Sequence, residues 1–121
     1  MIRFINCMRK KDDVSVNDFR KYWQDEKFDD FIRSVVKVTK AERYAKNLTL
    51  SVEANIRVMA DRGGDEPYDG ILEYWWTNAR ELMDLYETPE ATDLRKEIME
   101  YQRQFVDFER STAFFTEYEN E

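Results

Sequence analysis

The chain has 121 residues, a formal net charge of −7 at pH 7, 15% aromatic residues and no histidine. The length fits one domain with its own core, and the negative charge disfavours nucleic acid and anionic membranes, which both attract clustered Lys and Arg. The lack of histidine excludes His-based acid–base catalysis and His-ligated haem, and we expect neither a metal nor a cofactor.

No apolar run is long enough to span a bilayer, and the N-terminal residues 1–11 lack the pattern of a secretion signal. We therefore expect a cytoplasmic protein. The single cysteine, Cys7, leaves no partner for an intrachain disulfide, and its place in a strand-like run favours a small buried residue over a nucleophile.

Residues 2–9 alternate in a way that predicts a strand with apolar side chains on both faces. Ser15 then marks a helix start, because its side chain can cap the first turn of a helix that begins near residue 16. The acidic segment 25–30 weakens the apolar stripe. We expect the helix to break there and a second helical stretch to continue through about residue 38.

Residues 42–51 are predicted to form a second strand. Residues 52–68 contain glycines and a proline and are predicted to form a long irregular connection or a short helix, and connections of this length are often functional or mobile. Residues 69–76 are the clearest strand and carry large apolar side chains on both faces. A sheet of this kind must be covered twice, so we expect a second copy of the chain to cover the face that its own helices leave open.

Asn78 and Thr88 are predicted to start two further helices, and residues 111–118 close the chain as a fourth strand. The order β-α-β-β-α-β is the ferredoxin-like order. We therefore predict an α+β fold in which helices cover one face of an antiparallel sheet. We expect residues 1–121 to form a single domain that pairs into a homodimer.

Four stretches stand out, in this order: M-I-R-F-I-N-C-M-R-K-K, S-V-N-D-F-R-K-Y-W-Q-D-E-K, Y-D-G-I-L-E-Y-W-W and F-V-D-F-E-R-S-T-A-F-F-T-E. Their order and spacing resemble the EthD-domain family of dimeric α+β barrels. The resemblance implies two sheets that close a barrel and a cavity between sheet and helices in each protomer. It also implies a small-molecule role, since similar proteins act on polyketide-type aromatics or accompany the oxidative breakdown of ethers. The family usually has a His four residues after the helix Trp, and here that position is Lys27.

Three side chains are candidates for catalysis. Lys27 continues the four-residue spacing of Phe19 and Trp23, which predicts that it points to the apolar side, where a desolvated amine can act as a base or form a Schiff base. The alternative is that its ammonium reaches water or a nearby Asp. Glu73, on a strand, is either a general base or the cross-strand partner of Arg43 or Lys46.

Tyr22, the third candidate, either lines a pocket or is partly exposed beside a core Trp23. The predicted ligand-binding side chains come from the first helix and three strands: Phe4, Asn6, Trp23, Tyr44 and Trp75. The expected function is binding of a small, mostly apolar molecule by an accessory protein or a cofactor-independent lyase, cyclase or oxidoreductase. The alternatives are a non-catalytic carrier or sensor and a purely structural dimer with a filled core. An open cavity with convergent polar groups would separate these alternatives.

Overall fold

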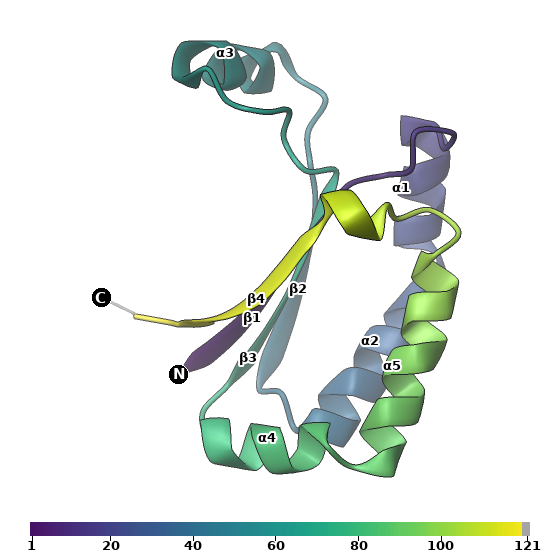
Figure 1. Cartoon of the computed structure of the whole chain (residues 1–121), viewed down its shortest axis with the longest axis vertical. Coiled ribbons are helices and arrows are strands. Elements are labelled where there is room, and N and C mark those ends of the chain that lie inside the picture. The colour runs from purple at the N-terminus through teal and green to yellow at the C-terminus, as the bar shows by residue number, and fades with distance from the viewer. Residues whose placement is uncertain (120–121) are drawn as a thin grey trace.

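The computed structural model describes residues 1–119. Four strands and five α-helices follow one another along this part of the chain (Figure 1). The elements in order are β1 (Ile2–Met8), α1 (Val16–Gln24), α2 (Glu26–Thr39), β2 (Arg43–Leu48), α3 (Glu53–Arg62), β3 (Gly70–Trp76), α4 (Ala79–Tyr86), α5 (Pro89–Gln102), a 3₁₀ turn (Phe108–Arg110) and β4 (Thr112–Glu117). None of these helices is long and apolar enough to cross a membrane.

The four strands form one antiparallel sheet in the order β2-β3-β1-β4. Helices α1, α2 and α5 lie along one face of the sheet, and α4 lies across one end of it (Figure 1). This arrangement confirms the predicted ferredoxin-like α+β fold. Among residues 1–119, no helix lies across the opposite face, called the open face below.

The register of the central strands decides which side chains meet the helices. Phe4 pairs with Tyr74 and Asn6 pairs with Leu72, and these side chains share the helix-facing side. The residues between them point the other way, so that Ile5 and Glu73 form a pair on the open face. Each central strand therefore supplies one wall of the core and one surface that the chain's own helices do not cover.

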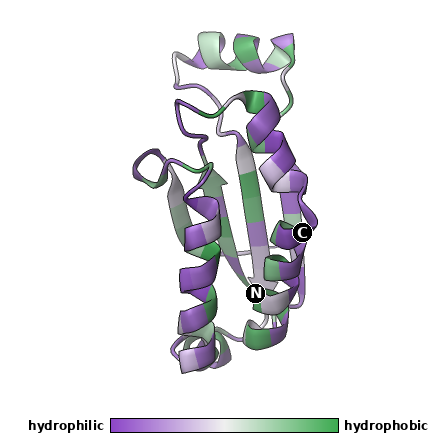
Figure 2. Ribbon diagram, turned by 90° about the vertical axis from the view of Figure 1, so that its right-hand side faces the viewer, coloured by the Kyte–Doolittle hydropathy of each residue, from purple (hydrophilic) through white to green (hydrophobic). Residues whose placement is uncertain are grey.

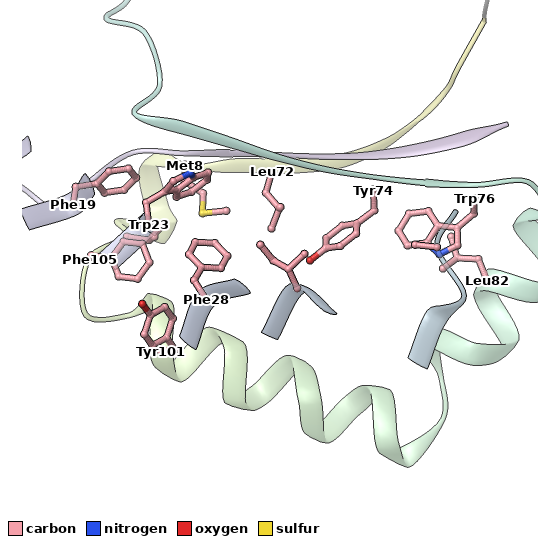
Figure 3. Close-up of a cluster of buried hydrophobic side chains, with 13 residues drawn as sticks. Met8, Phe19, Trp23, Phe28, Leu72, Tyr74, Trp76, Leu82, Tyr101 and Phe105 are labelled. Carbon is pink, nitrogen blue, oxygen red and sulfur yellow. The ribbon is translucent and has the colours of Figure 1, made fainter. Parts of the chain in front are cut away.

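The core between sheet and helices is dominated by aromatic side chains (Figure 3). Trp23 stacks on the ring of Phe19, with centroids 5.6 Å apart and ring planes 22° apart, and meets the ring of Phe28 edge-on at 5.0 Å. Phe105 is completely buried and contacts the same group of rings. Tight ring packing at this end of the sheet fixes how α1 and the start of α2 sit on the strands.

The predicted break between the first two helices occurs at Asp25. This residue is extended, and its carboxylate accepts a hydrogen bond from the backbone N–H of Lys27 at 2.9 Å, which caps the start of α2. Because the break resets the helical phase, Phe28 takes the buried position and Lys27 is exposed. The prediction that Lys27 points to the apolar side is therefore wrong.

The long connection between β2 and β3 contains the short helix α3, one of the two predicted forms. Its ends are held together where it leaves the sheet, since the N–H of Thr49 donates to the carbonyl of Asp69 at 3.0 Å. No residue of α3 is buried. The helix stands apart from the helices that cover the sheet (Figures 1 and 2).

Candidate functional site

A cavity of about 320 Å³ lies between the sheet and helices α2, α4 and α5. Strands β1, β3 and β4 form its floor. Most of the lining is aliphatic or aromatic, as expected for a small-molecule site. The apolar lining residues are Phe4, Val35, Val38, Leu72, Trp76, Leu82, Tyr86, Ala91, Leu94, Ile98, Met99, Phe108, Ala113 and Phe115.

Besides the exposed Tyr86, three uncharged polar side chains line this cavity without a hydrogen-bond partner in residues 1–119. Asn6 projects from β1, Tyr74 from β3, and Gln102 from the last turn of α5. Gln102 is only 4% exposed. None of the three side chains forms a hydrogen bond to another residue within 1–119. Because these side chains border the cavity and have no hydrogen-bond partner in the described part of the chain, their donors and acceptors are available to a bound molecule.

The hydroxyl of Tyr74 keeps its proton at neutral pH and can donate a hydrogen bond. Burial raises the pKa of Tyr74 far above its usual range, and the nearby Tyr44 adds a smaller effect in the same direction. The neighbouring indole is held differently, since Trp76 Nε1 donates to Thr39 Oγ1 at 3.2 Å, and that hydroxyl donates to the carbonyl of Val35 at 2.6 Å. The indole of Trp76 is therefore held in place by a hydrogen bond, whereas the hydroxyl of Tyr74 is available to a ligand.

Arg95 is the one charged residue among those lining the cavity in the described part of the chain. Its guanidinium lies 3.6 Å from the centre of the Tyr86 ring and donates to the Tyr86 carbonyl at 2.7 Å and to Thr92 Oγ1 at 3.2 Å. These contacts hold the charge at the side where α4 meets α5. The interior of the cavity thus presents neutral groups.

Of the predicted ligand-binding residues, Phe4 and Asn6 line the cavity. Trp23 does not, because it is buried in the aromatic core at the other end of the sheet. Tyr22 is half-buried and stacks on Phe105 with centroids 4.8 Å apart. Tyr44 is exposed on edge strand β2.

Glu73 and Trp75 point to the open face, away from the cavity, so their predicted place in one pocket with Phe4 and Asn6 is wrong. Glu73 lies 3.6 Å from Arg3 of the adjacent strand, so its ion-pair partner is neither of those predicted. Trp75 is buried beneath Arg43, whose guanidinium lies 4.1 Å from the indole ring.

Lys46, one of the two predicted partners of Glu73, instead faces the helices. Its ammonium pairs with Asp29 at 2.6 Å and donates to the carbonyl of Trp23 at 2.9 Å. Lys27 is placed on the surface near the ring of Tyr101, with its Nζ 5.6 Å from the ring centre. The candidate catalytic residues are therefore separated from one another and from the cavity.

Sequence reasoning missed Gln102 and Tyr74 as site residues. Gln102 lies one helical turn beyond the apolar Ile98, so the helical period predicts that the two side chains share the side of α5 that faces the sheet. Tyr74 lies two residues from Trp76 and shares its face. Both signals were present, but nothing in the sequence distinguishes a side chain beside an open space from one in a filled core.

The fold and the cavity define a ferredoxin-like α+β protein with a potential ligand site between sheet and helices. The model of the EthD domain matches residues 11–109, and the chain belongs to this family. No curated protein matches the sequence.

Several solved structures share the fold. One is a dimeric ferredoxin-like protein from Bacteroides fragilis NCTC 9343 (TM-score 0.61, 14% identity, 97% of this chain and 95% of that chain covered). A second is an ethyl tert-butyl ether degradation (EthD) family protein from Bacillus halodurans C-125 (0.60, 11%, 98% and 100%). A third is SnoaB, a cofactor-independent oxygenase from Streptomyces nogalater (0.60, 8%, 99% and 94%). At these identities the likeness establishes the fold.

Proposed function

We propose that this EthD-family protein binds a small, uncharged and largely apolar molecule in the cavity between sheet and helices. The observation that carries the proposal is the combination of about 320 Å³ of mostly apolar space with three neutral polar side chains, Asn6, Tyr74 and Gln102, that have no hydrogen-bond partner within residues 1–119. A ligand with hydrogen-bonding groups on an apolar body would satisfy both features.

The cavity favours ligand binding over a purely structural role. Aromatic rings fill the other end of the core, where Phe19, Trp23 and Phe28 are each no more than 2% exposed. They leave the space beside α4 and α5 open. A domain selected only for packing would gain stability by filling such a space, because voids cost dispersion and hydrophobic energy.

We propose further that the protein acts as a homodimer paired through the open face. Ile5, Cys7 and Ile71 on this face are only half-covered by their own chain, and Phe114 is 45% exposed. Dimeric proteins from Bacteroides fragilis and Thermobifida fusca with the same fold support this arrangement. Sedimentation that detects only monomer at micromolar concentration would refute it.

Relatives of the fold support a small organic ligand and leave the reaction open. SnoaB is an oxygenase that works without a cofactor, and another structural neighbour is a hydroxynitrile lyase from Passiflora edulis. An accessory or catalytic role in oxidative catabolism or secondary metabolism agrees with both. The non-catalytic carrier is the second candidate, and the observation that favours it is the placement of Lys27, Glu73 and Tyr22 outside the cavity.

The binding proposal is tested by fluorescence titration with 1-aminoanthracene, a neutral aromatic probe whose amine can donate to an amide oxygen. We expect saturable binding of one probe per protomer. Asn6→Leu and Gln102→Leu each remove one polar partner at nearly constant size, and a lost hydrogen bond of about 0.5–1.5 kcal/mol weakens binding about two- to twelve-fold. Lys27→Met serves as the control and should bind like the unchanged protein.

A charged probe provides a second test of the proposed site. The related anion 2-anthracenecarboxylate should bind at least about ten-fold more weakly, because Arg95, the one cation among the described lining residues, is already engaged with Tyr86 and Thr92 at the side of the cavity. Equal binding of both probes, or equal binding by all variants, would refute the proposed site.

A further inference from the structure

The segment between β2 and β3, residues 49–69, extends from the end of the sheet and is called the arm here. It carries α3, of which no residue is buried. Its large apolar side chains are exposed, with Leu50 at 65%, Ile56 at 62% and Val58 at 53%. Figure 2 shows hydrophobic residues along this isolated helix. Neither the ligand cavity nor the core accounts for them.

Helix α3 has little stability of its own. It has ten residues, and isolated helices shorter than about 12–15 residues are marginal in water. Its N-cap is Val52, which provides no side-chain hydrogen bond, and Ile56 and Val58 are β-branched residues with modest helix propensity. A helix of this kind is stabilised mainly by packing against another surface.

The chain's own protomer offers packing on one side of α3 only. Ile56 borders a hollow of about 390 Å³ between the arm and α1, with Phe19 and Leu48 among its lining. Val58 does not line this hollow, because two residues along a helix turn the side chain by about 200°. The side of α3 that carries Val58 therefore faces away from its own protomer.

The position of the arm indicates what covers that side. Figure 1 shows that α3 lies beyond the end of the sheet on the side opposite to α2 and α5, which is the side of the open face. The apolar part of that face is small and flanked by charges, since Arg3 and Glu73 form an ion pair on it. Stable interfaces bury about 800 Å² per partner, and an arm on the same side as the open face would add contact area to an interface formed there.

We infer that the arm packs against a second copy of this chain, with Val58 at the contact, so that two arms clasp the dimer symmetrically. The inference rests on the homodimer proposed above. In a two-fold dimer the same contact is made twice, so each side chain in it contributes twice to the free energy of association.

Hydrogen exchange of the full chain, measured by mass spectrometry above and below the dimer dissociation constant from sedimentation, tests the inference. We expect amides of residues 57–63 to exchange at least about ten-fold more slowly in the dimer than in the monomer. Equal exchange in both states, with β1 and β3 protected in the dimer, would overturn the arm contact and leave the dimer standing. A chain that stays monomeric would overturn both.

A charge substitution provides an independent measure. Val58→Asp alters an exposed side chain and should weaken dimerisation at least about ten-fold, with 1-aminoanthracene binding per protomer unchanged. Asn17→Asp, an isosteric change that adds the same charge to the exposed start of α1, should leave the dimer as it is. Equal dimer dissociation constants for the Val58→Asp variant and the unchanged protein would overturn the arm contact.

Discussion

Gly70 begins strand β3 at a point where the backbone lies directly against an aromatic ring. A methyl group added at this position would lie 2.7 Å from Cη2 and 2.8 Å from Cζ3 of Trp23. Neither side can move easily, because Gly70 is paired with Met8 and Leu48 on the two neighbouring strands and Trp23 is packed between Phe19 and Phe28. Gly70→Ala therefore forces overpacking in the centre of the core.

The expected cost follows from two opposing effects. Overpacking of a well-packed core costs about 1–3 kcal/mol, whereas replacing glycine by alanine restricts the unfolded chain and returns about 0.4–1 kcal/mol. We expect Gly70→Ala to lower the free energy of unfolding by about 1–2 kcal/mol, which corresponds to a fall of about 3–10 °C in Tm for a chain of this size. Gly64→Ala is the matched control, because an added methyl there meets nothing within 4 Å.

Urea unfolding followed by circular dichroism measures both variants, and a double-mutant cycle identifies the cause. Trp23→Phe removes the outer six-membered ring whose atoms meet the new methyl group. In that background Gly70→Ala should cost at least about 1 kcal/mol less than it does in the unchanged protein. Additive effects of the two substitutions, or a Gly70→Ala variant within about 0.5 kcal/mol of the unchanged protein, would refute the proposed steric conflict.

Three further predictions concern stability, and each is measured by urea unfolding. Burial raises the pKa of Tyr74, so above pH 10 the unfolded chain loses the hydroxyl proton while the native state keeps it. The free energy of unfolding should therefore fall as the pH rises from about 10 to 11, and it should fall less in the Tyr74→Phe variant. Lys46→Met should cost about 1–3 kcal/mol because it leaves the half-buried Asp29 unpaired, and a cost under about 0.5 kcal/mol would contradict this. Ser15→Ala should cost about 1 kcal/mol through loss of the cap on α1, whereas Ser15→Asp should retain most of the stability.

Local patterns in the sequence were sufficient to predict the strands and their order. Alternation of apolar side chains depends on the period of two in a strand, and both predicted capping residues at Ser15 and Asn78 accept the expected backbone hydrogen bonds. These signals act over a few residues and do not depend on what packs nearby. The EthD resemblance joined the same elements into one fold, which the family match confirms.

The direction of individual side chains was harder to predict, and Lys27 shows why. Its prediction assumed one continuous helix, in which positions four apart share a face. The extended residue Asp25 ends α1 and starts a new helix with a different phase, and Phe28 replaces Lys27 on the buried side. A break of one residue is visible in the sequence, but the rotation it introduces is set by tertiary packing.

The assignment of Glu73 to the cavity failed for a related reason. The alternation of side chains along a strand predicts which residues share a face of the sheet, but it does not predict which face the helices cover. Gly70 could have settled the question, because the side chain of Trp23 closes over that glycine and so marks the helix-facing side of β3. Leu72, Tyr74 and Trp76 follow on this side, and Glu73 then belongs to the open face.

The chemistry of the cavity follows from which groups remain after this correction. Tyr74 keeps its proton at neutral pH and donates, while the amides of Asn6 and Gln102 can both donate and accept. In the proposed ligand site, Tyr74 would donate to an acceptor oxygen of the bound molecule, and the two amides would pair with its remaining polar groups. Asn6 and Tyr74 alternate along β1 and β3 with residues of the open face. The same two strands therefore carry both the proposed ligand site and the proposed dimer surface.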